Sequence, residues 1–387
     1  MILLGALATA ALECKRESTP GHSEQAAPSA APSTSAAPSA SFALNGSSAP
    51  GASAAPSGSA EPGAGRKRVS AESSAMGTRL NFIALTSDKV DENQVHAAID
   101  KAIEEIRRLE SLMTTWTDDS EVSRINQAAG KAPVRVGPET IDVIAKSLWI
   151  SERSEGVFDI TFEVMHGLWR FDQDLEKRLP DSAAIAERRK LIDYRQIVLD
   201  RDKSTVFLKR PTSKISLGGI AKGYAIDKAA EILLAAGVED FLAQAGGDLY
   251  VHGNRGDGSP WMAGVRDPRG PDGSHFARMP VVDHAFSTAG DYERSYILNG
   301  KRYHHIIDPR TGYPATASRS VTVWAKDALT ADALDDAVFI LGVEKGLALV
   351  ESIDDAGAII VDPENRVHVS KRIKDKVIFE RPPTGGT

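Results

Sequence analysis

The 387-residue chain has a single cysteine, Cys14, so no disulfide can form within it and cysteine usage gives no information on the redox compartment. It also has little basic character, since 46 Lys and Arg stand against 53 Asp and Glu and no basic cluster is evident. The formal net charge of −7 therefore argues against general nucleic-acid binding. A hydrophobic fraction of 42% and a charged fraction of 26% are typical of a soluble protein with a sizeable core.

Long apolar runs are also missing. The first 14 residues, MILLGALATAALEC, are apolar but too short for a comfortable membrane span. An apolar segment that ends in a lone cysteine before a flexible stretch resembles a bacterial lipoprotein signal, with Cys14 as the lipidated residue. We therefore expect export to the periplasmic side of the inner membrane. An ordinary cleaved signal and a chance apolar end stay open, because a positive n-region is missing and Glu13 stands where a small residue is expected.

The chain divides by composition into four parts. Residues 1–16 form the signal segment, and residues 17–68 are a linker of mostly Ala, Ser, Pro and Gly that cannot bury enough surface to fold, so we expect disorder. Residues 69–378 form one globular domain, and residues 379–387 are expected to be a loose tail. In the domain, strand and helix patterns mix without strict βαβ alternation, which predicts an α+β fold with a largely antiparallel mixed sheet flanked by helices.

The helices and strands of this domain are predicted from apolar periodicity. The strongest helix runs from about 92 to 113, with Asp91 as its N-cap. Further predicted helices span 138–151 and 330–341, strands span 78–85, 241–252, 261–266, 285–289, 321–325, 358–361 and 366–369, and a hairpin joins 194–199 to 205–209.

One stretch, ISLGGIAKGYAIDKAAEIL at 215–233, combines features of an anion site. A short apolar run reaches Gly218-Gly219, and helical spacing begins at Ala221, which predicts a strand, a glycine pair and a helix. Glycines allow close approach of a ligand, a helix N-terminus offers unpaired N–H groups, and Lys222 adds a charge. An ordinary strand-to-helix turn is the competing interpretation. The stretch matches neither GxGxxG nor GxxxxGK[ST].

Three other features carry candidate chemistry. Trp116 stands in a polar segment, as a core plug or as an aromatic wall for a planar ligand. His305 lies beside a Pro/Gly turn, as a structural residue, a base or a donor to phosphate. Asp332 and Asp336 share a helix face with Asp335 beside them, either as a solvated acidic face or as oxygen ligands for Mg²⁺ or Ca²⁺.

Taken in order, eight motifs resemble the ApbE family, the FAD:protein FMN transferases. They are MGT, TTWTDDSEVSRIN, FDIT, SLGGIAKGYAID, AGGDLYVHG, STAGDYER, HHIIDPRTGYPA and TADALDDA, and the resemblance covers about 70–376. It implies that FAD is cleaved at its pyrophosphate and that FMN is attached to a Thr or Ser of a partner flavoprotein, with release of AMP. It also implies Mg²⁺ as cofactor and a periplasm-facing acceptor such as a redox-complex subunit.

The resemblance carries residue roles with it. FAD contacts are implied for Met76, Trp116, Val157, Phe158, Asp159, Ser216, Lys222 and Ile306. Metal ligation is implied for Gly219 through its carbonyl and for Asp332, Asp335 and Asp336. His305 or Asp308 is the hypothetical base that deprotonates the acceptor.

Two positions depart from the family pattern. Ser216 stands where many members have aspartate, and Asp336 where threonine is common, so Asp336 adds a carboxylate to the metal site. Two other functions stay open, an FAD pyrophosphatase that yields FMN and AMP, and a periplasmic flavin-binding lipoprotein without turnover.

Overall fold

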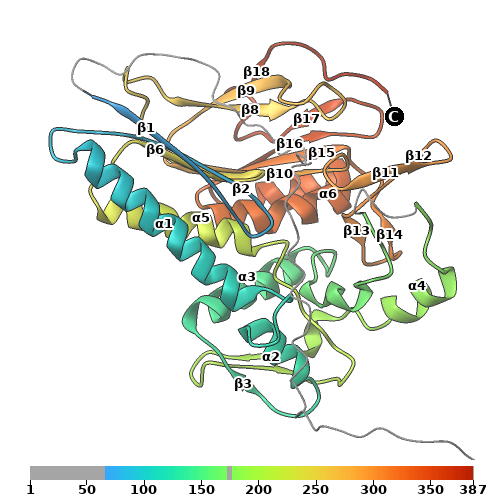
Figure 1. Ribbon diagram of the computed structural model, residues 1–387. Coiled ribbons are helices and arrows are strands. Elements are labelled where there is room, and N and C mark those ends of the chain that lie inside the picture. Colours follow the sequence, from blue (N-terminus) through green and yellow to red (C-terminus); the bar gives the residue numbers. More distant parts are fainter. Residues whose placement is uncertain (1–65, 172–176, 387) are drawn as a thin grey trace, which may run out of the picture. The chain divides into compact units, whose positions relative to one another are not determined.

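An eight-stranded antiparallel sheet forms the centre of the computed structural model, which describes residues 66–171 and 177–386. Its strand order is β1-β2-β6-β7-β10-β15-β16-β17 (Figure 1). The strands are β1 (Arg68–Ala75), β2 (Thr78–Leu85), β6 (Phe241–Ala245), β7 (Asp248–His252), β10 (His284–Gly290), β15 (Ser320–Ala325), β16 (Ala356–Val361) and β17 (Val367–Val369). Every strand pairing among the described residues is antiparallel, so the predicted α+β class is confirmed.

The two faces of this sheet are covered differently. Helices α1 (Glu92–Met113), α5 (Ala221–Ala235) and α6 (Ala328–Glu351) pack on one face, and a small sheet of β8 (Trp261–Arg266), β9 (His275–Val281) and β18 (Ile378–Phe379) covers the other (Figure 1). Side-chain alternation in β2 follows this division: Phe82 joins the helix-side core and Ile83 the core under the small sheet. Both cores are apolar, which explains why the central strands are buried on both faces.

The remaining elements surround one end of the helix layer. They are α2 (Glu121–Gln127), β3 (Val134–Arg135), α3 (Pro138–Arg153), η1 (Ile160–Met165), α4 (Ser182–Arg189), η2 (Tyr194–Gln196), β4 (Ile197–Asp200), β5 (Thr205–Leu208), β11 (Ser295–Leu298), β12 (Lys301–His304), β13 (Ile307–Asp308) and β14 (Tyr313–Pro314). The predicted hairpin is confirmed as β4 and β5. No helix within the described residues is long and apolar enough to cross a membrane.

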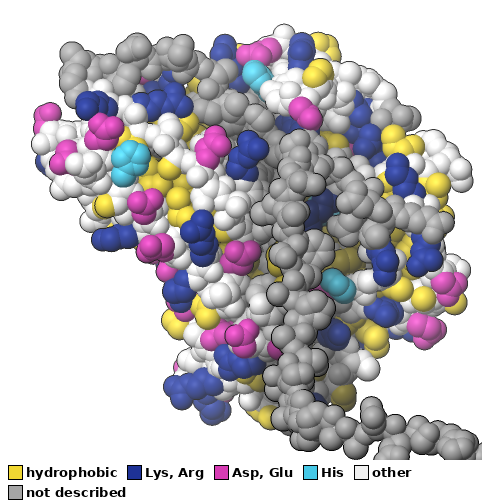
Figure 2. Space-filling view, in the orientation of Figure 1, with side chains coloured by type: hydrophobic (Ala, Val, Ile, Leu, Met, Phe, Trp, Pro, Cys, Tyr) yellow, Lys and Arg dark blue, Asp and Glu magenta, His cyan; other side chains and the backbone are white. Residues whose placement is uncertain are grey.

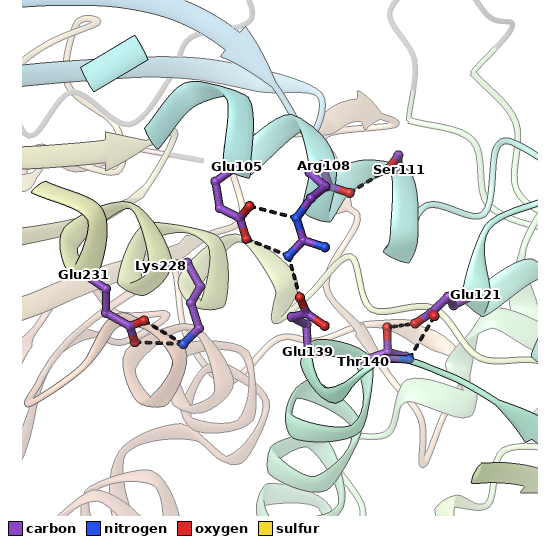
Figure 3. Close-up of polar contacts among 9 residues, drawn as sticks. Glu105, Arg108, Ser111, Glu121, Glu139, Thr140, Lys228 and Glu231 are labelled. Carbon is purple, nitrogen blue, oxygen red and sulfur yellow. Dashed lines mark hydrogen bonds and ion pairs between the residues drawn. The ribbon is translucent and has the colours of Figure 1, made fainter. Parts of the chain in front are cut away.

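Helix α1 begins where its sequence predicts. The Asp91 side chain accepts a hydrogen bond from Gln94 N, and the Gln94 side chain accepts one from Asp91 N, which completes a capping box. Arg108 of α1 contacts Glu105 of the same helix and Glu139 of α3 (Figure 3). These surface ion pairs orient α1 against α3 but contribute little free energy each.

Helices α5 and α6 are joined at their N-terminal ends. The carboxylate of Asp227 in α5 accepts hydrogen bonds from Ala328 N at 2.7 Å and Leu329 N at 2.9 Å, so it caps the first turn of α6. Gly223 of α5 lies against Ala328 with no room for a side chain between the helices. This close approach brings the first turn of α5 to the acidic face of α6, and α6 itself kinks at Gly342, where φ is +74°.

Some expectations are wrong in detail. Residues 215–217 are not a strand but an extended lead-in that Asn126 holds through Ile215 N and O. The strand predicted over 241–252 is two strands, β6 and β7, because Gly246-Gly247 form the turn between them, with φ of +59° at Gly246. Strand β1 was not predicted, because it reads RVSAESSA and five of its eight positions are polar.

The two ends of the domain are also better anchored than predicted. The last residues of the predicted linker are part of the folded domain, since Arg66 forms an ion pair with Asp240 and Arg68 begins β1. The C-terminal segment is not loose, because Phe379 pairs with β9 and Thr384 donates to the buried Asp267. Residues 1–65, including the signal segment and Cys14, lie outside the described residues.

Candidate functional site

A buried cluster of carboxylates lies where α5, α6 and the central sheet meet. Asp332 and Asp335 come from α6 and Asp248 from the start of β7, and one oxygen of each lies within 4.8 Å of the others. Lys222 of α5 enters this cluster, with its Nζ 2.9 Å from Asp248 Oδ2 and 3.2 Å from Asp332 Oδ1. The cluster therefore contains more negative than positive charge, although all three carboxylates are buried.

The N-terminus of α5 binds an anion, as its sequence predicts, but that anion is the side chain of Asp332 and not a ligand. Gly223 N donates a hydrogen bond of 2.8 Å to Asp332 Oδ2. A carboxylate at a helix N-terminus is stabilised by the free N–H groups and the helix dipole. The first turn of α5 thus fixes Asp332, and Lys222 Nζ donates to both oxygens of the same carboxylate.

Ser287 of β10 connects the two remaining carboxylates. Its Oγ contacts Asp248 Oδ1 and lies 2.5 Å from Asp335 Oδ2. A hydroxyl has one hydrogen, so Ser287 donates to one carboxylate and must accept from the other, which requires a proton on that carboxylate. Asp335 Oδ1 accepts from Asp336 N at 2.5 Å. The serine therefore holds two acids together that would otherwise repel each other.

Burial and mutual repulsion shift the acid–base behaviour of this cluster. Burial, together with repulsion from Asp248, raises the pKa of Asp332 to about 6 despite the attraction of Lys222. Burial and the charge of Asp332 raise the pKa of Asp336 to about 7. The pKa of Asp335 rises well above its usual value because of burial and its neighbours Asp336 and Asp332. Burial would lower the pKa of Lys222, but Asp248 and Asp332 raise it overall.

This donor set fits a hard divalent cation. Three clustered carboxylates share one ammonium group, and a cation that replaced the protons of the excess acids would remove their repulsion. Oxygen ligands without cysteine or histidine suit Mg²⁺ or Ca²⁺. Gly219 lies beside this group, since a Cβ at that position would be 3.4 Å from Asp336 Oδ2 and 3.9 Å from the Phe158 ring. The structure therefore brings together the predicted metal residues Gly219, Asp332, Asp335 and Asp336.

A second group of predicted residues gathers at the turn between β1 and β2. Met76 and Gly77 have φ values of +52° and +68°, the geometry of a two-residue type I′ hairpin turn. Met76 is strained there, because non-glycine residues rarely adopt positive φ. A Cβ on Gly77 would be 3.5 Å from Trp116 Cη2 and 3.8 Å from Arg294 Nη2. Trp116 is 75% exposed, so the core-plug interpretation is wrong and an aromatic wall is available.

His305 lies between these two groups. It follows β12 directly, and its backbone N–H donates to Arg294 O at 3.1 Å. Among the described residues, His305 Nδ1 has no hydrogen-bond partner. Burial, with the positive charges of Arg294 and Lys222 and the neighbouring His304, lowers the pKa of His305 to about 3. The imidazole is therefore neutral at neutral pH, with a nitrogen free to accept a proton.

The lowered pKa of His305 predicts a stability effect in acid. Below an ordinary value near 6.5, the unfolded chain binds a proton at this histidine that the folded chain does not, so the free energy of unfolding falls as the pH drops toward about 3. We expect His305→Gln to lose less Tm than the wild type between about pH 7 and about pH 5. Thermal denaturation at both pH values measures this, with His96→Gln, an exposed histidine of α1, as control. Equal losses in wild type and His305→Gln would contradict the assignment.

Asp308 and Asp159 are engaged in the fold. Both carboxylate oxygens of Asp308 accept hydrogen bonds from Arg310, at 2.7 to 3.1 Å, so the prediction that Asp308 is a base is not supported. Asp159 accepts from Thr161 N, Thr161 Oγ1 and Tyr194 N, and thus caps η1.

The other predicted FAD contacts surround the same region. Val157, Phe158 and Ile306 are buried. Ser216 N donates to Ile160 O at 3.0 Å, and Ser216 Oγ accepts from Gly218 N at 3.3 Å. These bonds place the lead-in to α5 against the loop that carries Phe158.

Sequence reasoning missed Asp248, Ser287 and Arg294. Each stands in one of the family-like motifs, AGGDLYVHG or STAGDYER. None has a second functional residue in its own segment at the spacing that would put both on one face of a helix or strand. For Asp248 the available signal was an acid directly after a glycine pair. For Ser287 it was a serine at the start of a run of small residues. Only the pairing of β7 with β10 brings Asp248 and Ser287 together.

Known proteins are similar to this chain over most of its globular domain. The model of the ApbE family matches residues 76–360. A FAD:protein FMN transferase of Treponema pallidum (strain Nichols) is 34% identical over 298 residues, which cover 73% of this chain and 82% of that protein. One of Klebsiella pneumoniae (strain 342) is 32% identical over 283 residues, covering 72% and 80%.

Solved structures are similar over most of the described residues. The crystal structure of the ApbE protein from Thermotoga maritima has a TM-score of 0.72 and 33% identity, covering 80% of this chain and 99% of that one. The flavin transferase ApbE from Vibrio cholerae has a TM-score of 0.71 and 27% identity, with the same coverage.

Proposed function

This chain belongs to the ApbE family, and we propose that it is an FAD:protein FMN transferase that works with a divalent cation, Mg²⁺. The observation that carries the proposal is the buried group of Asp248, Asp332 and Asp335 around Lys222, beside the neutral His305. Asp332, Asp335, Asp336 and the Gly219 carbonyl would hold the cation. When bound, the cation supplies charge neutralisation of the pyrophosphate and of the leaving AMP.

The reaction exchanges the phosphoanhydride bond of FAD for a phosphoester bond to the acceptor. The hydroxyl oxygen of the acceptor Thr or Ser attacks the phosphorus on the FMN side of FAD, and the bond from that phosphorus to the bridging oxygen breaks. AMP leaves with the bridging oxygen, and the hydroxyl proton passes to a base. Catalysis of such transfers depends on positioning and charge neutralisation more than on covalent chemistry. Lys222, fixed by two carboxylates, is a positioned cation for a phosphate oxygen.

His305 is the proposed base, acting through its free Nδ1. Burial, His304 and the positive charges of Arg294 and Lys222 lower the pKa of His305 to about 3, which makes it a weak base before substrate binds. An anionic diphosphate next to these cations offsets their repulsion of the imidazolium and raises the pKa of His305 toward the working pH. Substrate binding would thus activate the base.

The flavin end of the substrate is assigned to the exposed Trp116 at the Met76-Gly77 turn. An exposed indole offers a flat apolar surface on which a planar ring stacks favourably.

The acceptor is proposed to be a periplasm-facing flavoprotein, such as a redox-complex subunit. The apolar segment that ends at Cys14 supports export and a lipid anchor for this chain.

One incubation tests these assignments together. The protein is mixed with FAD, Mg²⁺ and a candidate acceptor protein, and the acceptor is then denatured and inspected for flavin fluorescence. Fluorescence on the denatured acceptor with release of AMP is the expected result. Free FMN and AMP without a labelled acceptor would instead establish a pyrophosphatase, and unchanged FAD a binding protein.

A further inference from the structure

Two buried arginines connect the small sheet to the segment that follows β10. Arg266 ends β8 and Arg269 lies in the turn after it, and their side chains are only 7% and 8% exposed. The Lys and Arg side chains visible in Figure 2 lie on the surface, where water weakens their ion pairs. Ion pairs of buried arginines are screened much less, so these two can fix the groups that they bind.

Both arginines bind the turn between β10 and β11. Arg269 forms a two-point pair with Asp291, with Nη1 2.6 Å from Oδ1 and Nη2 2.7 Å from Oδ2. Arg266 Nη1 donates to Glu293 Oε1 at 3.3 Å, and its guanidinium lies 4.5 Å from the centre of the Tyr292 ring. A two-point pair fixes the orientation of a carboxylate as well as its distance. The turn is thus held at three successive residues.

This turn joins the two ends of the candidate site. On its N-terminal side, β10 carries Ser287, which contacts the carboxylates of the metal cluster. On its C-terminal side, Arg294 lies beside Gly77, where an added Cβ would be 3.8 Å from Arg294 Nη2. The carbonyl of Arg294 also accepts the hydrogen bond from His305 N. The course of the turn therefore sets where Arg294 and His305 lie relative to the metal cluster.

The C-terminal segment fixes the backbone of Arg269 from behind. The carboxylate of Asp267, which is buried, accepts hydrogen bonds from Arg269 N at 3.2 Å and from Thr384 N at 3.0 Å. Thr384 Oγ1 donates to the same carboxylate at 2.7 Å, and Arg381 Nη2 lies 3.6 Å from it. Because the backbone of Arg269 is anchored in this way, the position of Asp291 follows that of Arg269.

We propose that Arg269 is a positioning residue for bound FAD, which acts through Asp291 to fix Arg294 at the flavin end and His305 beside it. This inference rests on the proposed function, because it uses the assignment of the flavin end to the Met76-Gly77 turn. A cation that is already in place when the ligand arrives spares the free-energy cost of ordering it on binding. The small sheet thereby contributes to FAD affinity from the other face of the central sheet.

FAD binding without any acceptor protein tests the proposal. Quenching of flavin fluorescence in the presence of Mg²⁺ measures the affinity of the full chain. We expect Arg269→Met to weaken FAD binding at least about tenfold. Arg269→Lys keeps the charge but not the two-point pair, so an intermediate loss is expected. The control Arg66→Met removes an ion pair with Asp240, at the end of β2 opposite the Met76-Gly77 turn, and should leave FAD affinity unchanged.

A double-mutant cycle separates positioning from a general loss of stability. If Arg269 acts through Asp291, the double variant Arg269→Met, Asp291→Asn loses no more FAD affinity than the weaker-binding single variant. Breaking a buried pair also lowers Tm, so Tm is recorded for each variant, and Arg269→Lys with Asp291→Asn completes the test where Arg269→Met does not fold. Unchanged FAD affinity in folded Arg269 variants, an equal loss in Arg66→Met, or additive losses in the cycle would overturn the proposal. A wild type that binds FAD but transfers no FMN would count against the proposed function alone.

Discussion

Replacing Asp332 with asparagine is expected to lower the rate of FMN transfer by at least about 100-fold, the effect of removing one well-placed charge-stabilising group. Asp332 receives bonds from Gly223 N and Lys222 Nζ, and it is a predicted metal ligand. The amide keeps the shape and can still accept from Gly223 N, but it loses the negative charge. The rate loss should therefore come without unfolding.

Two measurements separate this explanation from a structural one. Calorimetric titration with Mg²⁺ in the absence of FAD should show weaker binding to Asp332→Asn than to the wild type, and Tm should not fall. Asp354→Asn, which changes an exposed aspartate just after α6, serves as the control. Unchanged Mg²⁺ affinity in Asp332→Asn would remove Asp332 from the metal site.

Gly223→Ala is expected to destabilise the fold by about 3 kcal/mol, at the upper end of the range for overpacking. A Cβ there would lie 2.7 Å from the carbonyl carbon of Ala328 and 2.8 Å from Asp332 Cβ, and closer still to the Ala328 oxygen. None of these atoms is the end of a flexible side chain. Helix α5 would have to move away from α6 and take Gly223 N from Asp332.

The sign of this effect is informative. In an open helix, glycine to alanine stabilises by about 1 kcal/mol. Denaturant unfolding of Gly223→Ala and of Gly385→Ala, where an added Cβ meets open space, measures the difference. A gain in the free energy of unfolding for Gly223→Ala would mean that α5 and α6 are not packed as closely as described.

Much of the fold is predictable because helix bounds depend on features of the local sequence, such as apolar spacing and capping residues. Helix α1 has the predicted bounds and the predicted N-cap, Asp91. Strand β2 and strand β8 also have the predicted bounds. Strand β1 was missed because its alternation is polar at many positions, and its place is set by pairing with β2 and not by its own pattern.

The site was predictable where its residues lie on one helix and not where they come from separate strands. Asp332 and Asp335 share α6, and Lys222 lies in a recognisable helix start. Asp248 could not be predicted from its own segment. It belongs to the site because β7 lies next to β10, the strand that carries Ser287.

The separate two-stranded sheet of β11 and β12 has a consequence for which changes the fold tolerates. Asp248, Ser287 and Asp332 are fixed by the central sheet and by α5 and α6, where insertions would disturb two cores at once. The tip of the hairpin, at Asn299 and Gly300, has positive φ values and lies in neither core. A change in the length or charge of this tip would therefore leave the carboxylate cluster and both cores in place.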